Sequence, residues 1–242
     1  MTTFVLVHGA WGGSWGFHEV RPLLWRAGHE VFTPSLTGIG ERLHLSRPDV
    51  DLSTHIEDVA ATVHYEDLDD IVLLGFSYGG MVVTGALDRI GDRVRHLVYL
   101  DAFVPSDGDS VQALTGLGAR SAARSDEGGD QSWTIAPMPR DLGDPEQTRW
   151  AEERRSPQPI ATFTEPVRLS KPVESWGFGL TYIKATADPG EAADSAFWQA
   201  AARAKASDRW AYHEIECNHM VPIMEPNELA DLLMAVGSNQ AG

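Results

Sequence analysis

The fold of this 242-residue chain is decided by the stretch Asp70-Ile71-Val72-Leu73-Leu74-Gly75-Phe76-Ser77-Tyr78-Gly79-Gly80. Its first part is apolar on both faces, as a central strand of a parallel sheet requires. Apolar residues then recur at helical spacing over Met81–Ile90. Gly75 and Gly79 flank Ser77 in the pattern G-x-S-x-G, and small neighbours let a strand turn at once into a helix. The stretch predicts a strand, a strained turn that exposes Ser77, and a helix. The alternative is a tight turn whose Ser77 caps the helix.

Outward from this stretch, short apolar runs alternate with helical patterns. We expect strands at Phe4–Val7, Glu30–Pro34, Asp70–Phe76, Arg95–Leu100, Thr181–Thr186 and Ala211–Glu216, and helices at His18–Ala27, Ser53–His64, Met81–Ile90 and Pro226–Val236. Thr54 and Glu57 have the spacing of a capping box. This alternation predicts an α/β fold with a mostly parallel central sheet flanked by helices.

Residues 105–178 interrupt the alternation, because they are rich in Pro, Gly and charged residues and contain no clear strand. The segment is too long for a plain loop of a compact domain. Since predicted strands lie on both sides of it, we interpret it as a cap inserted into a single domain that spans residues 1–242.

Composition narrows the class of protein. Hydrophobic residues make up 43% and charged residues 22%, which is typical of a soluble globular protein. The net charge of −16 argues against a nucleic-acid partner and against attraction to anionic membranes. The single cysteine, Cys217, excludes an intramolecular disulfide. No apolar run approaches the roughly 18–20 residues that span a bilayer, and the N-terminus lacks a basic segment with a cleavage site. We therefore expect a cytoplasmic protein, and the composition specifies no oligomeric state.

A serine hydroxyl becomes a useful nucleophile when a base takes its proton. His219 directly follows the last predicted strand, and loops after parallel strands meet at one edge of the sheet. Ser77 and His219 are therefore expected to come together as nucleophile and base. His8 also follows a strand, but it is expected to shape the glycine-rich turn beside it.

The base in turn needs a carboxylate that fixes its tautomer. Asp188 follows the penultimate predicted strand, which gives the chain order Ser77, Asp188, His219 that is typical of this kind of turn. We predict Asp188 as the acid. Asp101, which ends a strand at the same edge, and Glu191, close to Asp188, are the alternatives.

Acyl transfer also needs two backbone N–H groups that hold the developing oxyanion. One is expected from Tyr78, the residue after the nucleophile, and the other from Ala10 in the early turn.

These residues together resemble the α/β-hydrolase superfamily. The likeness narrows to its methylesterase and hydroxynitrile-lyase branch through the segments His8-Gly9-Ala10-Trp11, Pro22-Leu23-Leu24, Ala27-Gly28-His29, Gly75–Gly80, Ala102-Phe103-Val104-Pro105 and Thr186-Ala187-Asp188. The resemblance implies the triad Ser77–Asp188–His219 and an oxyanion hole at Ala10 and Tyr78. Lyases of this group carry a Thr after the first His and a Lys after the catalytic His, where this chain has Gly9 and Met220.

Within the branch, the chain looks most like bacterial esterases that hydrolyse carbendazim, a methyl carbamate on a benzimidazole. That likeness implies cleavage to 2-aminobenzimidazole, methanol and CO₂ through an acyl-enzyme. Apolar walls for such a flat substrate are expected from Trp11, Trp133, Trp150, Phe163, Trp176 and Phe178, whose alternative role is to pack the cap. The alternatives are a general carboxylesterase or methylesterase, a hydroxynitrile lyase, and a non-catalytic receptor. No dinucleotide, phosphate-loop or zinc motif occurs, so no cofactor or metal is expected.

Overall fold

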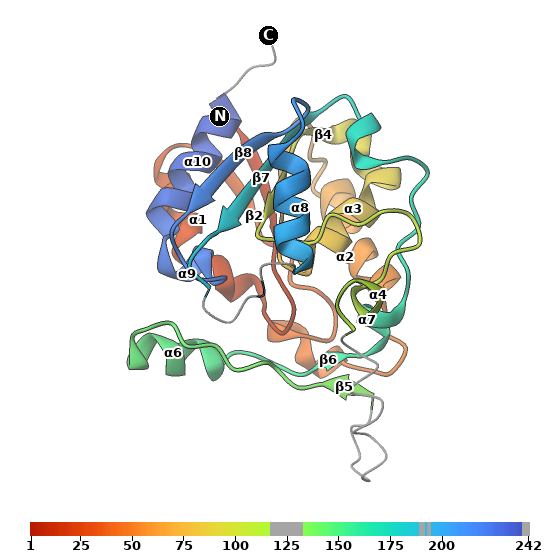
Figure 1. Cartoon of the computed structure of the whole chain (residues 1–242), viewed down its shortest axis with the longest axis vertical. Coiled ribbons are helices and arrows are strands. Elements are labelled where there is room, and N and C mark those ends of the chain that lie inside the picture. Colours follow the sequence, from red (N-terminus) through yellow and green to blue (C-terminus); the bar gives the residue numbers. More distant parts are fainter. Residues whose placement is uncertain (117–132, 189–191, 193–194, 239–242) are drawn as a thin grey trace.

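The main sheet has six parallel strands in the order β2-β1-β3-β4-β7-β8 (Figure 1). The computed structural model describes residues 1–116, 133–188, 192 and 195–238. The strands are β1 (Thr3–Val7), β2 (Glu30–Phe32), β3 (Ile71–Phe76), β4 (Val94–Leu100), β7 (Gly179–Ala185) and β8 (Ala211–Ile215). The predicted α/β fold and its parallel sheet are confirmed.

Helices cover both faces of this sheet. One face packs against α2 (Leu52–Tyr65), α3 (Gly79–Ile90) and α8 (Ala196–Lys205), and the other against α1 (Val20–Arg26), α9 (Val221–Met224) and α10 (Pro226–Ser238). Short 3₁₀ helices, η1 (Ser14–Phe17), η2 (Gly40–Leu45) and η3 (Gly91–Arg93), complete this part of the chain. Two apolar layers therefore form, one on each side of the sheet.

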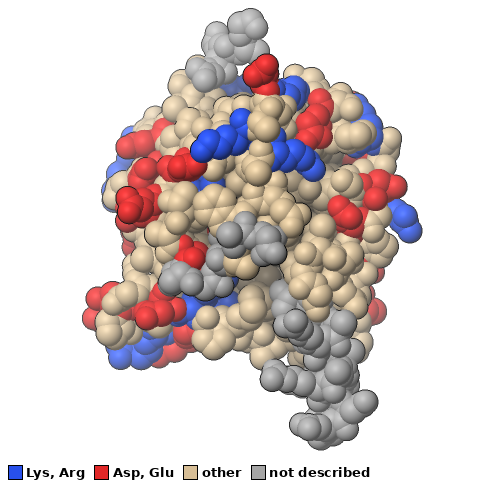
Figure 2. All heavy atoms as spheres, in the orientation of Figure 1, with Lys and Arg blue, Asp and Glu red and all other residues tan. Residues whose placement is uncertain are grey.

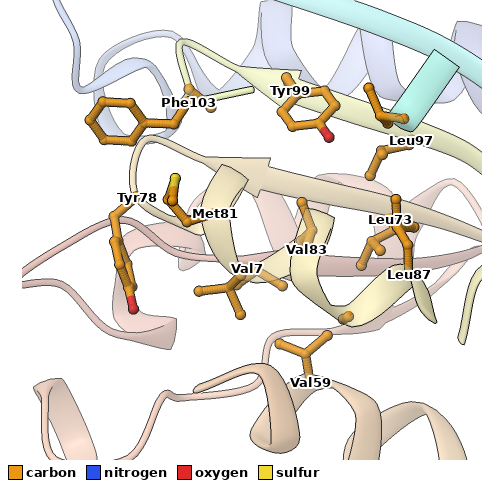
Figure 3. Packing of buried hydrophobic residues seen from close by; sticks show 14 of the residues in the cluster. Val7, Val59, Leu73, Tyr78, Met81, Val83, Leu87, Leu97, Tyr99 and Phe103 are labelled. Carbon is orange, nitrogen blue, oxygen red and sulfur yellow. The ribbon is translucent and has the colours of Figure 1, made fainter. Parts of the chain in front are cut away.

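The centre of the sheet is buried because β3 is apolar at every position. Val7 and Leu73 face the same layer as Val83 of α3 and Val59 of α2, and Figure 3 shows these side chains in one cluster. Burying aliphatic side chains of this size contributes about 1.5–3 kcal/mol each. This rigid layer holds the C-terminal ends of β3 and β4, which carry Ser77 and Asp101.

The start of α2 differs from the sequence-based expectation. Asp51, not Thr54, is the N-cap residue, and its carboxylate accepts a hydrogen bond from the Thr54 N–H at 2.8 Å. The Thr54 side chain in turn accepts a hydrogen bond from the Asp51 backbone N–H. The capping box is therefore formed by Asp51 and Thr54, one turn earlier than the predicted pair Thr54 and Glu57.

We use the name cap segment for residues 105–178, which lie between β4 and β7 in the chain. Its described elements are α4 (Val111–Thr115), β5 (Thr134–Ile135), α6 (Pro145–Glu152), β6 (Gln158–Pro159), α7 (Ala161–Thr164) and η5 (Val173–Ser175). The strands β5 and β6 pair antiparallel, although no clear strand was expected here. In Figure 1 this segment runs across one end of the main sheet, with α6 at its outer side.

Acidic and basic side chains are interspersed on the face seen in Figure 2, many of them near its outline. Among the described residues, no helix is both long and apolar enough to cross a bilayer.

Candidate active site

Ser77 lies in a strained turn between β3 and α3. Its φ of 55° is in the left-handed region, which costs a non-glycine residue energy. A Cβ on Gly75 would come within 2.7 Å of the Gly79 carbonyl oxygen, and one on Gly79 within 2.6 Å of the Val7 carbonyl oxygen. The two glycines thus permit the tight strand-to-helix turn, as the sequence predicted.

Ser77, His219 and Asp101 form a continuous hydrogen-bonded relay. Ser77 Oγ lies 2.9 Å from His219 Nε2, and His219 Nδ1 lies 2.6 Å from Asp101 Oδ2. A neutral imidazole with its proton on Nδ1 donates to the carboxylate and accepts the serine proton at Nε2. The three side chains come from the ends of β3 and β4 and from the loop after β8.

Asp101 is held on both carboxylate oxygens. Its Oδ1 accepts a hydrogen bond from Lys184 Nζ at 2.7 Å, and neither side chain is exposed. Burial by itself would raise the pKa of the Asp101 carboxyl, but the hydrogen bond and charge of His219 and the Lys184 ammonium bring that pKa below its ordinary value. Asp101 is therefore ionised at neutral pH.

The prediction of Asp188 as the acid is corrected by this geometry. Asp188 forms an ion pair with Arg140 of the cap segment at 2.7 Å, while Asp101 contacts the imidazole. Both aspartates follow neighbouring parallel strands, so both lie at the same sheet edge. Glu191, the other alternative, lies outside the described residues.

Aromatic rings fix the orientation of the imidazole. Phe197 stacks on His219 with ring centroids 5.2 Å apart and an interplanar angle of 8°. Phe76 packs against the same imidazole, with ring centroids 4.9 Å apart. These two rings restrict rotation of His219 out of the plane that joins Ser77 and Asp101.

The two residues predicted to form the oxyanion hole lie close to Ser77 in the structure. Ala10 and Tyr78 both line the cavity that contains Ser77 and His219. The neighbouring Trp11 N–H is directed elsewhere, since it donates to Gln158 Oε1 at 2.8 Å. His8 shapes this turn as expected, because its Nδ1 lies 2.9 Å from the Gly9 carbonyl and its Nε2 accepts from Leu36 N–H.

Tyr78 is anchored by a buried histidine that the sequence did not single out. His55 Nε2 donates to the Thr37 carbonyl at 2.8 Å, so Nδ1 accepts from the Tyr78 hydroxyl at 2.9 Å. Burial is the main cause that lowers the pKa of His55 to about 4, so the ring is neutral. The contact fixes the side chain of Tyr78, the residue whose backbone N–H is predicted to hold the oxyanion.

The cavity over Ser77 has a volume of about 160 Å³ and is mostly apolar. Its aromatic lining consists of Trp11, Trp15, Phe17, Phe76, Tyr78, Phe103, Phe163 and Phe197. Trp11 and Phe163 were expected there, and they pack edge to face at 5.6 Å. Two guanidinium groups, Arg140 and Arg155, also reach the cavity. Within the described ranges, no group of three or more His, Cys, Asp and Glu side chains is arranged to hold a metal ion.

Three predicted substrate-contacting tryptophans do not line this cavity as the structure describes it. Trp150 of α6 packs on Trp15 and His18 of the main domain. Trp176 stacks on Phe178 before the start of β7, at the sheet edge opposite Ser77. Trp133 lies next to β5, where its carbonyl accepts from Ile160 N–H. For these aromatics, and for Phe178, packing of the cap is the role that the structure supports.

Comparison with known proteins places this chain in a family. Residues 4–232 match the model of the alpha/beta hydrolase family. A carbendazim hydrolyzing esterase of Nocardioides sp. (strain SG-4G) is 38% identical over 98% of this chain and 100% of its own length. Methylesterase 2 of Arabidopsis thaliana is 31% identical over 42% of this chain and 40% of its own.

A solved extracellular alpha/beta-hydrolase from a Paenibacillus species, described as sharing structural and functional homology with tobacco Salicylic Acid Binding Protein 2, has a TM-score of 0.84 at 26% identity. It covers 99% of this chain and 100% of that one. The chain belongs to the α/β hydrolase family, and it is an esterase-type hydrolase of that family. The resemblance to the methylesterase and hydroxynitrile-lyase branch is confirmed.

Proposed function

We propose that this protein cleaves small methyl esters or methyl carbamates through Ser77, His219 and Asp101. The observation that carries the proposal is the relay from Ser77 Oγ to His219 and on to Asp101, at the floor of an apolar cavity. Ser77 attacks the carbonyl carbon while His219 takes its proton, and Ala10 and Tyr78 N–H groups hold the oxyanion. Asp101 stabilises the imidazolium that forms.

The substrate that we favour is carbendazim. The full-length similarity to a carbendazim hydrolyzing esterase supports this choice, as does a cavity walled by aromatic rings that suits a flat benzimidazole. Attack by Ser77 expels methanol and leaves the carbamoyl group on the serine. Water activated by His219 then releases a carbamic acid, which loses CO₂ to give 2-aminobenzimidazole.

The nucleophile is tested with Ser77→Ala. The variant is expected to lose p-nitrophenyl acetate hydrolysis by about 10⁶-fold in kcat while its circular dichroism and thermal unfolding stay unchanged, because triad members act as a unit. Hydrolysis that persists in a folded Ser77→Ala protein would place the nucleophile elsewhere.

The substrate is tested by chromatographic detection of 2-aminobenzimidazole from carbendazim, with methyl benzoate as a plain methyl ester in parallel. If the protein hydrolysed methyl benzoate but not carbendazim, its function would be that of a general methylesterase. A cyanohydrin is the third substrate, and its cleavage without ester turnover would favour a lyase. Met220 lines the cavity at the position where related lyases carry a Lys, so we expect no cyanohydrin cleavage.

A further inference from the structure

Lys184 is a charged side chain at the most buried part of the site. It lies on β7, one residue beyond Ile183, which pairs with Leu100 of β4. Its side chain has no exposed area, and its Nζ donates to Asp101 Oδ1 at 2.7 Å and to the Ala185 carbonyl. The ammonium also lies 4.4 Å from the centre of the Trp198 ring. Lysine is almost never fully buried unless it is paired.

Fold stability alone does not account for such a pair. Two buried charges lose their hydration, and apolar residues of similar volume often stabilise a core equally well. Here the partner of the lysine is the carboxylate that contacts His219. Each oxygen of Asp101 has its own donor, Lys184 on Oδ1 and His219 on Oδ2.

We propose that Lys184 is a positioning residue of the reaction, which holds Asp101 Oδ1 so that Oδ2 faces His219, and whose charge moderates the attraction between that carboxylate and the imidazolium. This inference rests on the proposed serine-hydrolase function. The carboxylate orients the imidazole in one tautomer, and the ammonium prevents it from holding the imidazolium too strongly. His219 can then return the proton to the leaving group and act again as a base.

Other ionisable groups must be considered in any pH profile. Tyr212 on β8 and Cys217 before His219 interact electrostatically with Asp101, and Glu225 after α9 interacts with Cys217. Arg140 lines the cavity, and Asp188 follows β7. Burial raises the pKa of the Tyr212 phenol, and it raises that of the Cys217 thiol to about 11, so neither group ionises near neutral pH. Arg140 and Asp188 are paired with each other. Lys184 is the cation whose ammonium contacts Asp101 in the described part of the chain.

The test compares pH profiles of kcat/KM for Lys184→Met, Lys184→Gln and Lys184→Arg. Lys184→Met removes charge and donor, and we expect kcat/KM to fall about 10–100-fold. The acid limb of the kcat/KM profile of this variant should move to higher pH by about one unit, because the Asp101 carboxylate then stabilises the His219 imidazolium more strongly. Lys184→Gln keeps a donor without charge, so its acid limb should move similarly with a smaller fall in kcat. Lys184→Arg keeps the charge and should leave the limb in place.

Lys205→Met is the matched control. Lys205 also pairs with a carboxylate, Glu214, and lies over a ring, Tyr212, but it is largely exposed. This variant should leave both the rate and the acid limb unchanged.

A second measurement is independent of turnover. In a Ser77→Ala background, the His219 ring-proton signal, identified by its absence in His219→Gln, is titrated by NMR with and without Lys184→Gln. We expect its midpoint to move to higher pH in the Lys184 variant. The proposal would be overturned if the acid limb stayed fixed in both the Met and Gln variants and the NMR midpoint stayed fixed in the Gln variant, whether or not the rate fell. If Lys184→Met does not fold, Lys184→Gln decides. A wild type without esterase activity would refute the proposed function, and the titration would still report on Lys184.

Discussion

Asp101 has a left-handed backbone conformation, with a φ of 41°, at the first position after β4. Ser77 has the same kind of conformation after β3. Both side chains are thereby turned out of their strands toward His219. Strain of about 1–3 kcal/mol at each position is retained because the surrounding contacts enforce it.

This geometry predicts which aspartate matters for the rate. Asp101→Asn is expected to lower kcat by ~10³–10⁴-fold, since the amide no longer stabilises the imidazolium or its tautomer. Asp188→Asn is the matched control. It breaks the ion pair with Arg140, a residue of the cavity wall, so its smaller effect should appear mainly in KM. Steady-state kinetics on one ester decide the ranking, and a larger loss in kcat for Asp188→Asn would return the acid role to that residue.

Ser77 and His219 could be predicted from the sequence, because both signals are local. Ser77 stands between two glycines after an apolar strand, and His219 directly follows the last strand, so neither requires knowledge of tertiary contacts. The sequence could not decide between Asp101 and Asp188, because neighbouring parallel strands bring both to one sheet edge. The missed signal is Lys184, a charged residue within the otherwise uncharged and largely buried β7. A lysine at a buried strand position needs a carboxylate beside it, and Asp101 is on the adjacent strand.

Among the elements, β6 connects the cap segment to the turn His8-Gly9-Ala10-Trp11 that follows β1. Gln158 is fully buried, accepts from Trp11 N–H and donates to Thr162 Oγ1 at 2.8 Å. Ser156 N–H donates to the Trp11 carbonyl at 3.0 Å. The cap thus fixes both backbone groups of the residue that follows Ala10.

Gln158→Leu is expected to destabilise the protein by about 1–3 kcal/mol, because it leaves the Trp11 N–H buried without an acceptor. If the loop then shifts, kcat should fall about tenfold with little change in KM, because the Ala10 N–H is proposed to hold the oxyanion. Urea unfolding and steady-state kinetics measure the two effects. Gln147→Leu on α6, whose hydrogen bond is weak at 3.5 Å, is the control. Equal behaviour of the two variants would refute a role of β6 in the site.

Strands of the main sheet could be predicted because each is apolar at most positions. This pattern can be recognised without knowing which elements pack against the strand. The aromatic residues of the cap segment could not be placed in this way. The sequence around Trp150 and around Phe163 does not show which face of the cap meets the cavity, because that depends on how the segment folds over the sheet. Phe163 lines the cavity, while Trp150 packs outside it.

At the scale of the whole molecule, one buried histidine, His55, and one half-buried histidine, His96, make stability depend on pH. Burial, as the main cause, lowers the pKa of His55 and of His96 from 6.5 to about 4. Unfolded chains take up these protons near pH 6.5, whereas the folded protein resists protonation until about pH 4. Their contribution to stability is complete above pH 6.5 and is lost as pH falls toward 4.

We therefore expect the free energy of unfolding, from urea titrations, to decrease between about pH 7 and pH 5. The decrease should be smaller in His96→Gln, whose side chain can keep a hydrogen bond to Thr181 Oγ1. A variant of an exposed histidine, His44→Gln, should leave the pH dependence as it is in the wild type. Constant stability over this range would contradict the argument.

Because the cap segment is attached at Trp11, some of its residues must be retained, whereas others can be replaced by those of a relative. Its anchors are the Ile135 carbonyl, which accepts from Trp11 Nε1, together with Ser156 and Gln158. The stretch 136–155 between them brings Met138, Arg140 and Arg155 to the cavity wall. A chimera that grafts this stretch from a relative, with the anchors retained, is thus a route to new substrate preferences on an unchanged catalytic centre.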